Sequence, residues 1–380
     1  MEPKIRFKGF DGEWKEERLS EISSSIASGK NIDHKGPYPL YGSTGIIGTT
    51  DKPYHEGPML LVARVGANAG FLQLVNEKCG VSDNTLIVKP KDPVTDNYLF
   101  QYFKFFNLNR FIYGSGQPLI TGGMLKKMPV RYGLKEERET LIDYFTSLDS
   151  QISASTSRLA SLKQMKAASL QAMFPQEGET VPKIRFKGFE GEWKTCPLYH
   201  FAKKRIEKNT KMLYNITLTN SAEFGIIDQR NFFDHEISNS ENINGYYVVR
   251  DHDFVYNPRI SSSAPVGPIN QNKLGYTGVM SPLYLVFEIN GINRDFLEIF
   301  FHTTLWHKYM FDNGNTGARF DRLAISDEDF MKMPIPDIDI EEQQAIANYF
   351  TSLDRQISLQ SQRLEKLKQI KSACLDKMFV

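Results

Sequence analysis

The sequence has little of what secreted, membrane-spanning or metal-binding proteins require. Its three cysteines, Cys79, Cys196 and Cys374, stand far apart, form no CxxC pair and have no histidine at ligand spacing. We therefore expect reduced thiols and no structural zinc. No run of about 18 apolar residues occurs, which argues against a membrane span. The charged opening, MEPKIRFKGF, lacks the apolar core of a signal peptide. These absences predict a cytoplasmic protein without membrane association.

The sequence also lacks the motifs of common enzymes. It has no Gly-Lys-Ser/Thr phosphate-binding loop. Residues 256–259, Tyr-Asn-Pro-Arg, match only half of the Asn-Pro-Pro-aromatic motif of adenine methyltransferases. The acidic stretch 337–341 is not followed by the lysine expected of a magnesium-dependent nuclease. We predict a chain with no catalytic residues, no metal and no cofactor of its own.

Two smaller clusters have a functional and a structural interpretation. Asp251-His252-Asp253 is either a proton relay or, as we favour, a polar turn. His302 and His307 are spaced poorly for one metal ion on a helix, so packing is the favoured role. The net charge of +1 argues weakly against nucleic-acid binding, so any DNA contact must use local basic patches or a basic partner.

A long internal repeat is the main signal. PKIRFKGFDGEWK at 3–15 recurs as PKIRFKGFEGEWK at 182–194, and the segment 144–174 recurs at 349–379. One large unit has therefore been duplicated. The two repeats are nearly identical at their ends but divergent between them. This pattern favours two domains that recognise different targets over a duplication followed by random divergence.

Short similar segments can be aligned inside the divergent regions of the two repeats. We align Val62-Ala63-Arg64-Val65 with Asn257-Pro258-Arg259-Ile260, 86–88 with 285–287, 98–103 with 296–301, and the turns 114–117 with 314–317. Short Val, Ile, Leu and Tyr runs between Gly, Ser, Asn and Pro turns predict mixed α/β heads whose loops form a recognition surface.

The segments 136–175 and 341–380 each predict one long helix, because both begin with Glu-Glu and contain no interior proline or glycine. Apolar residues spaced alternately by four and three predict a helix-pairing seam. Its apolar members are Phe145, Leu148, Ile152, Leu159 and Leu162 in the first helix and Phe350, Leu353, Ile357, Leu364 and Leu367 in the second. Both copies have polar interruptions, Ser155 with Lys166 and Gln360 with Lys371. We expect a coiled coil between the helices. The alternative is that each helix lies on its own domain.

The predicted fold is therefore mixed α/β, with two recognition domains related by a pseudo-two-fold repeat and separated by two long helices. The expected boundaries are 1–135 and 176–340 for the domains, and 136–175 and 341–380 for the helices.

These features resemble the specificity subunits of type I restriction–modification systems along essentially the whole chain. The likeness rests on the paired openings, the Lys-Met-Pro segments at 127–129 and 332–334, and the helices that contain YFTSLD. Segments 38–45, 62–66 and 81–84 resemble one common type of target recognition domain.

The resemblance implies that each recognition domain reads one half of a bipartite site in double-stranded DNA. It implies that the helices set the number of unread base pairs and dock two methyltransferase subunits, which bind S-adenosylmethionine. Restriction subunits that use ATP and magnesium would join this core. The alternatives are a protein-interaction adaptor without DNA readout and a fused DNA-modifying enzyme.

Base edges are read by Arg, Asn, Gln, Ser and Thr side chains, whereas phosphate contacts position the protein. In the first domain the expected DNA-binding residues are Ser43, Thr44, Arg64, Asn68, Asn84 and Gln117. In the second domain we expect Lys203, Lys204 and Arg205 to contact phosphates. The residues expected nearer the bases are Arg259, Ser261, Ser262, Asn315 and Arg319.

Overall fold

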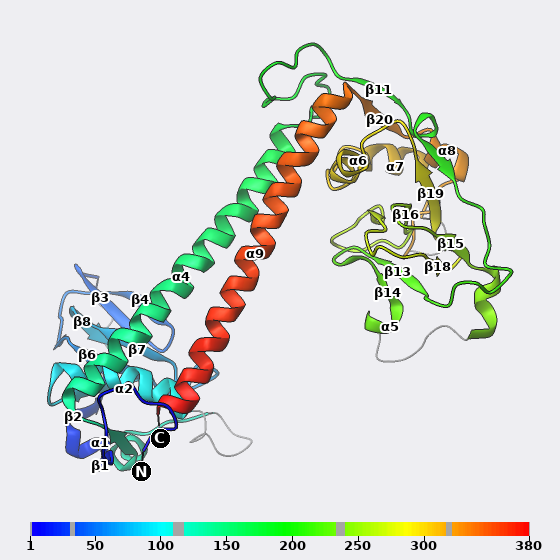
Figure 1. Ribbon diagram of the computed structural model, residues 1–380. Coiled ribbons are helices and arrows are strands. Elements are labelled where there is room, and N and C mark those ends of the chain that lie inside the picture. The colour runs from blue at the N-terminus through cyan, green and yellow to red at the C-terminus, as the bar shows by residue number, and fades with distance from the viewer. Residues whose placement is uncertain (1, 31–34, 109–117, 233–239, 317–320, 380) are drawn as a thin grey trace. The chain divides into compact units, whose positions relative to one another are not determined.

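The computed structural model describes residues 2–30, 35–108, 118–232, 240–316 and 321–379. The chain divides into two compact units (Figure 1): unit 1 is residues 1–158 with 360–380, and unit 2 is residues 159–359. Two long helices, α4 (Lys135–Ala172) and α9 (Ile340–Met378), each run without interruption from one unit into the other. Within the described residues, no helix is both long and apolar enough to cross a membrane.

Two four-stranded sheets form the head of unit 1. The first is antiparallel and has the order β2 (Ser23–Ser28), β9 (Thr85–Pro90), β6 (Met59–Ala63), β7 (Leu72–Val75). The second has the order β4 (Gly45–Thr50), β3 (Tyr38–Gly42), β8 (Lys78–Val81), β5 (His55–Glu56). Its β3 and β8 are parallel, and the other pairs are antiparallel.

Short helices complete this head: α1 (Leu19–Ile22), α2 (Pro93–Phe106) and α3 (Gly122–Lys127). The Asp92 carboxylate caps α2 by accepting a hydrogen bond from Thr95 N at 3.0 Å, and Pro93 follows it where no amide hydrogen is needed. A two-stranded ribbon of β1 (Lys15–Arg18) and β10 (Pro129–Tyr132) ties the start of the chain to the segment that leads into α4.

Unit 2 repeats the first sheet with the same strand order. Its strands are β12 (Ala202–Lys204), β19 (Leu285–Ile289), β16 (Phe254–Tyr256) and β17 (Ile269–Gln271). The β11–β20 ribbon (Lys194–Pro197 and Pro334–Asp337) repeats β1–β10. Two further antiparallel pairs match β3–β4 and β5–β8 of the second sheet: β13 (Leu218–Ser221) with β14 (Gly225–Asp228), and β15 (Tyr247–Val249) with β18 (Gly278–Met280). A parallel bridge between Thr217 and Val279 matches the parallel pair of β3 and β8.

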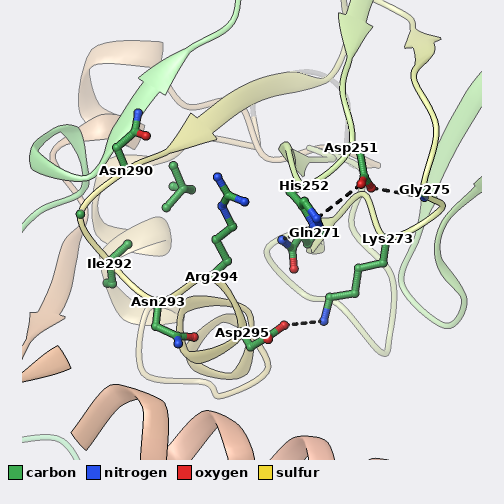
Figure 2. A pocket seen from close by; sticks show the side chains of 12 residues that line it. Asp251, His252, Gln271, Lys273, Gly275, Asn290, Ile292, Asn293, Arg294 and Asp295 are labelled. Atoms are coloured by element: carbon green, nitrogen blue, oxygen red, sulfur yellow. Dashed lines mark hydrogen bonds and ion pairs between the residues drawn. The ribbon is translucent and has the colours of Figure 1, made fainter. Parts of the chain in front are cut away.

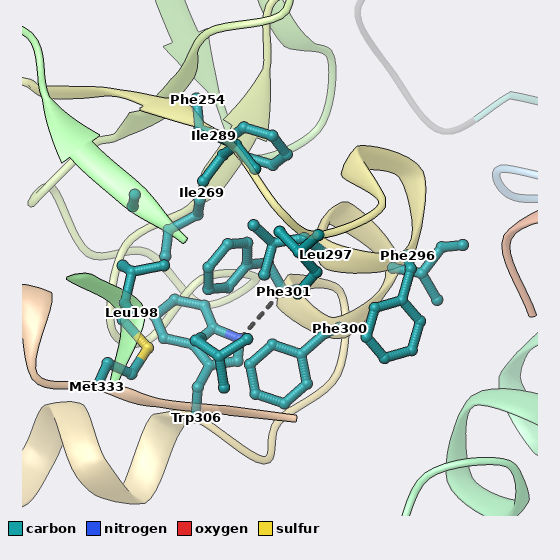
Figure 3. Packing of buried hydrophobic residues seen from close by; sticks show 14 of the residues in the cluster. Leu198, Phe254, Ile269, Ile289, Phe296, Leu297, Phe300, Phe301, Trp306 and Met333 are labelled. Carbon is teal, nitrogen blue, oxygen red and sulfur yellow. Dashed lines mark hydrogen bonds between the residues drawn. The ribbon is translucent and has the colours of Figure 1, made fainter. Parts of the chain in front are cut away.

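Short helical turns connect these strands. They are η2 (Leu198–His200), α5 (Gln229–Phe232), η3 (Ser240–Gly245), α6 (Arg294–Phe301), α7 (His307–Asn313) and α8 (Asp327–Met331). The core of unit 2 lies between α6 and the four-stranded sheet (Figure 3). There the Phe301 and Trp306 rings are 5.7 Å apart, and Trp306 Nε1 donates to the Phe301 carbonyl at 3.0 Å. The buried indole therefore keeps its hydrogen bond.

The repeated openings are fixed in the same way in both units. Arg6 Nε and Nη2 donate to the Glu137 carboxylate at 2.6 and 2.8 Å, and Arg185 donates to Glu342 at 2.7 and 2.8 Å. Glu137 is only 1% exposed. The carboxylates in the first turns of α4 and α9 thus bind the opening segment as well as favouring the helix N-terminus.

In unit 1 the first part of α4 packs antiparallel against the last part of α9. Tyr144 Oη lies 3.3 Å from Cys374 Sγ, Lys371 donates to Asp149, and Gln360 Nε2 donates to the Ser155 carbonyl at 3.2 Å. The aromatic ring of Phe379, at the end of α9, enters the core of unit 1.

In unit 2 the last part of α4 packs against the first part of α9 with equivalent contacts. Lys166 Nζ donates to Asp354 Oδ1 at 2.6 Å, and the hydroxyls of Ser169 and Tyr349 are 2.8 Å apart. Phe174 enters this core as Phe379 enters the other.

The predicted mixed α/β fold with paired long helices is confirmed. The predicted seam residues are all buried or half-buried. The helix bounds differ from the expected 136–175 and 341–380 by one to three residues. The compact units divide both helices, so the four-part division of recognition domains and helices stays a prediction.

Candidate functional site

In unit 1 the expected DNA-binding residues lie on neighbouring loops. Ser43 and Thr44 form the turn between β3 and β4, and exposed Asn84 lies in the turn between β8 and β9. Ser82 N donates to the Tyr41 carbonyl at 2.8 Å, so the two turns adjoin. They present hydroxyl and amide groups from one edge of the head.

Arg64 and Asn68 lie on the connection between β6 and β7, beside the same edge. Arg64 N donates to the Asn84 carbonyl at 2.9 Å, and Phe71 N donates to the Asn68 carbonyl at 2.9 Å. Arg64 is half-buried, and its Nε is buried without a hydrogen-bond partner among the described residues. The structure thus brings Arg64, Asn68 and Asn84 together, while Gln117 lies outside the described residues.

In unit 2 two of the expected phosphate-binding residues already have acidic partners. Arg205 donates to Asp253 at 2.6 and 2.9 Å and to Glu288 at 2.9 Å, and its side chain is 15% exposed. Lys204 pairs with Asp327 on the surface. Lys203 is exposed and keeps its ammonium free for solvent or an anion within the described part of the chain.

Burial has the largest effect on the pKa of Asp253, the partner of Arg205. Burial raises the pKa of the Asp253 carboxyl, while the guanidinium of Arg205 and the Arg250 amide oppose that rise by donating to it. A buried carboxylate of this kind needs its arginine, so we assign Arg205 a structural role and remove it from the proposed phosphate contacts.

Arg259, Ser261 and Ser262 lie on the loop between β16 and β17, and all three are exposed. The Asn257 side chain accepts a hydrogen bond from Arg259 N at 3.0 Å and donates to the Asn220 carbonyl at 2.8 Å. Asn257 is buried, so its side-chain amide anchors the loop backbone to the protein interior. The loop is a rigid support for exposed polar groups.

Asn315 joins the same region through backbone pairing. Asn315 bridges Ala324, and Arg322, two residues before Ala324, bridges Arg259. Arg319 lies outside the described residues. Arg322 was missed by sequence reasoning, because nothing local marks it and only this non-local pairing places it beside Arg259.

The sheets correct our alignment of the two interiors by one residue. Val62 pairs with Leu86 in unit 1, and Tyr256 pairs with Leu285 in unit 2. Since Leu86 and Leu285 are equivalent, Val62 corresponds to Tyr256 and Val65 to Arg259. Arg64 therefore corresponds to Pro258, not to Arg259. Because side chains alternate along an extended chain, the two arginines point to opposite faces.

A polar pocket of about 770 Å³ lies elsewhere in unit 2 (Figure 2). Lys273 points towards Asp295, with Nζ 3.0 Å from Oδ1, and His252 Nε2 lies 3.4 Å from Asp251 Oδ2. Asp253 binds Arg205 instead of His252. The favoured interpretation of Asp251-His252-Asp253 as a polar turn fits these contacts better than a relay. Among the described residues, no group of three or more His, Cys, Asp or Glu side chains is placed to hold a metal ion.

Comparison with known proteins finds similarity in the first part of the chain. Residues 11–164 match the family described as "Type I restriction modification DNA specificity domain". This part of the chain is therefore similar to type I specificity domains. A curated relative, the type I restriction enzyme EcoprrI specificity subunit of Escherichia coli, is 26% identical over 159 residues. That match covers 39% of this chain and 40% of the relative.

Solved structures show the same fold along the whole chain. The type I restriction–modification S subunit from M. genitalium aligns with a TM-score of 0.64 at 13% identity, covering 100% of this chain and 99% of that one. A chain from a structure that describes complex assembly and conformational transition of the type I R-M system aligns with a TM-score of 0.51 at 15% identity, covering 97% and 98%. The predicted resemblance to type I specificity subunits is confirmed.

Proposed function

We propose that this protein is the DNA-sequence specificity subunit of a type I restriction–modification complex. The observation that carries the proposal is the match of residues 11–164 to the specificity-domain family, in a chain that repeats the same sheet order in a second unit. In this proposal each unit reads one half of a bipartite DNA site, and the chain itself is not catalytic.

The proposed readout uses loops on the two heads. In unit 1 the candidates are the adjoining turns with Ser43, Thr44 and Asn84, together with Arg64 and Asn68. In unit 2 they are the loop of Arg259, Ser261 and Ser262, the nearby Asn315, and Lys203 on β12. Gln117, Lys204 and Arg319 stay in the proposal as sequence-based candidates. Loop amides, hydroxyls and guanidiniums suit base edges, and free ammonium groups suit phosphates.

The proposed partners carry the chemistry. Two methyltransferase subunits that bind S-adenosylmethionine would dock on α4 and α9, and restriction subunits that use ATP and magnesium would join them in the cytoplasm. The curated relative is named as one subunit of a restriction enzyme, and the second aligned chain comes from an assembly of the type I R-M system. Both support partnership with other subunits of such a system.

Mapping methylated adenines in cells with and without this gene tests the central proposal. We expect a bipartite motif that is methylated only when the gene is present. Exchanging residues 35–130 for those of a relative should change one half of the motif and leave the other half and the spacing intact. If the deletion removes no methylated motif, the proposal fails.

Lengthening both long helices tests their proposed role as a spacer. Seven residues inserted into the middle of α4 and of α9 add about 10 Å, or roughly three base pairs of duplex. We expect both half-sites to persist with a longer unread spacing. The matched control inserts seven residues into the connecting segment 175–182, and there the spacing should stay as it was. If the unread spacing between the half-sites stayed the same in the helix variant, the helices would not act as a spacer.

Two other functions make different predictions. A protein-interaction adaptor would show no salt-dependent preference for the methylated duplex over a scrambled one. A fused DNA-modifying enzyme would methylate or cleave DNA as a purified single chain. The net charge of +1 favours the adaptor weakly, and the match to the specificity-domain family outweighs it.

A further inference from the structure

Arg259 and Arg322 stand directly opposite each other on an isolated antiparallel bridge. Ile260 N donates to the Asp321 carbonyl at 3.0 Å, and Leu323 N donates to the Pro258 carbonyl at 2.9 Å. These bonds flank the arginines, so the two form a non-hydrogen-bonded pair, the type that brings opposed side chains closest on one face. The backbone bonds therefore direct both arginine side chains to the same face of the bridge.

Little acidic charge balances this pair within the described residues. The Arg259 side chain is exposed and has neither a hydrogen-bond nor an ion-pair partner there. Arg322 Nε is buried without a hydrogen bond, and its one carboxylate, on Asp321, is 3.6 Å away and 64% exposed. Like charges directly opposite each other weaken a β pair, so the arginines do not stabilise this bridge.

Unit 1 has the same bridge without the charges. Val65 stands opposite Leu119, and the flanking bonds recur: Gly66 N to the Pro118 carbonyl at 3.1 Å and Ile120 N to the Arg64 carbonyl at 2.8 Å. Two apolar residues therefore suffice for the bridge. The arginine pair is a feature of unit 2 that the fold itself does not need.

Arg322 also lines a cavity, whose other charged lining residues are Lys204 and Asp327. Arg322, Pro258 and Lys204 line a pocket of about 400 Å³ together with Tyr247 and Tyr284. Lys204 is paired with Asp327, so the unbalanced positive charge on this side belongs to the two arginines.

We propose that Arg259 and Arg322 together bind one phosphodiester group of DNA beside the half-site of unit 2. This inference rests on the proposed function. An anion compensates two neighbouring positive charges, whereas a base edge carries no net charge, so the pairing changes our expectation for Arg259 from base contact to phosphate contact. Rigid backbone support lets such a contact fix the position of the head on the duplex.

The test measures binding of the full chain, assembled with its methyltransferase subunits, to the mapped duplex and to a scrambled one over a salt series. Replacing both arginines by glutamine (R259Q and R322Q together) should weaken binding about tenfold to both duplexes and reduce the log–log salt slope by about one. Asp321→Asn should act in the opposite direction and tighten binding about two- to threefold. Leu119→Gln at the matched position of unit 1 should leave the salt slope unchanged.

Each other outcome has a distinct meaning. An unchanged salt slope in the double variant, with normal specific binding by the parent protein, overturns the phosphate site and leaves the proposed function standing. A changed base preference at the unit 2 half-site with an unchanged slope also overturns it, because the pair would then read a base. Absence of specific binding by the parent protein contradicts the proposed function itself. Thermal unfolding of each variant, expected to match the parent, separates lost contact from lost fold.

Discussion

Lys166 Nζ lies 2.6 Å from Asp354 Oδ1, and the equivalent residues of the other repeat, Lys371 and Asp149, form the same pair with the roles of the two helices exchanged. Each pair holds one end of α4 against α9 within its own unit. A lysine at a seam position would be costly without a partner, and each of these has a carboxylate on the opposite helix.

Reversing one charge should weaken the pairing, and reversing both should restore it. Asp354→Lys should cost about 0.5–1 kcal/mol, and Asp149→Lys about 1–2 kcal/mol, because Lys371 is the less exposed lysine and Lys104 also lies 3.4 Å from Asp149. Thermal unfolding of the full chain measures both. The exchanged pair K166D/D354K should recover most of the loss, and the effect should shrink in high salt. A double variant no more stable than the single one would contradict the pairing.

The ring of Phe379 should matter mainly for unit 1, and that of Phe174 mainly for unit 2. Phe379 is 3% exposed and lies 5.6 Å from the Phe145 ring, whereas Phe174 is fully buried, 5.6 Å from Trp193. Truncation of a buried phenylalanine typically costs about 3–5 kcal/mol.

Hydrogen exchange resolved along the chain tests this assignment. Phe379→Ala should reduce protection in α2 and the unit 1 sheet, and Phe174→Ala should reduce it in α6 and the unit 2 sheet. Equal loss of protection in both units from either substitution would show that the helix ends are not separate anchors.

Asp96 should make stability depend on pH. It is 3% exposed, burial raises its pKa to about 6 with a further contribution from Asp92, and Lys89 acts in the opposite direction. A carboxyl whose pKa is higher in the folded state stabilises the fold at low pH and loses that contribution as pH rises through about 4 to 6.

Asp96→Asn removes this titration. At pH 8 we expect the variant to be about 2 kcal/mol more stable than the parent, because no charge is buried, and the gain should fade towards pH 4. Unfolding midpoints across this range measure it. Asp92 is the control, because its pKa is shifted in the opposite direction. Its hydrogen bonds to Thr95 and the charge of Arg138 outweigh its desolvation and lower its pKa. A gain that is constant with pH would rule out the titration of Asp96 as the cause.

Arg205 should contribute to folding and not to DNA binding. Arg205→Gln leaves Asp253, 3% exposed, without its main partner, so we expect a loss of about 3 kcal/mol. The loss should be larger at pH 8 than at pH 5, because an unpaired buried carboxyl can be protonated at the lower pH.

The matched control for Arg205 is its exposed neighbour Lys203. Lys203→Gln should leave unfolding unchanged and reduce DNA affinity in a salt-dependent way. DNA affinity, measured under conditions in which each variant is still folded, separates the roles of the two residues. A DNA-binding defect in Arg205→Gln at full stability would return Arg205 to the phosphate contacts.

The long helices were predictable because their signal is local and periodic. Alternating spacings of four and three place Phe145, Leu148, Phe350 and Leu353 on one stripe, and all four are buried. Their repetition with the same polar interruptions predicted that the helices pair with each other. The near-identical openings make equivalent contacts in the two units, through the pairs of Arg6 and Arg185 with carboxylates.

Register inside the heads was not predictable from the sequence. β16 has three residues and β6 has five, too few for alternation to fix an alignment. Hydrogen bonding to β19 and β9 decides which residues correspond, and it moves Arg259 into register with Val65. A shift of one residue reverses the face on which a side chain lies.

The amino-acid sequence by itself determined the duplication, the paired helices and the kinds of polar residue available for readout, since each of these is written in short-range pattern. Tertiary structure alone decided which arginines are available. Arg205 is occupied by Asp253 and Glu288, 48 and 83 residues away, whereas Arg322 is placed beside Arg259 by a backbone bridge. Charge availability depends on contacts between distant segments, and no local pattern encodes such contacts.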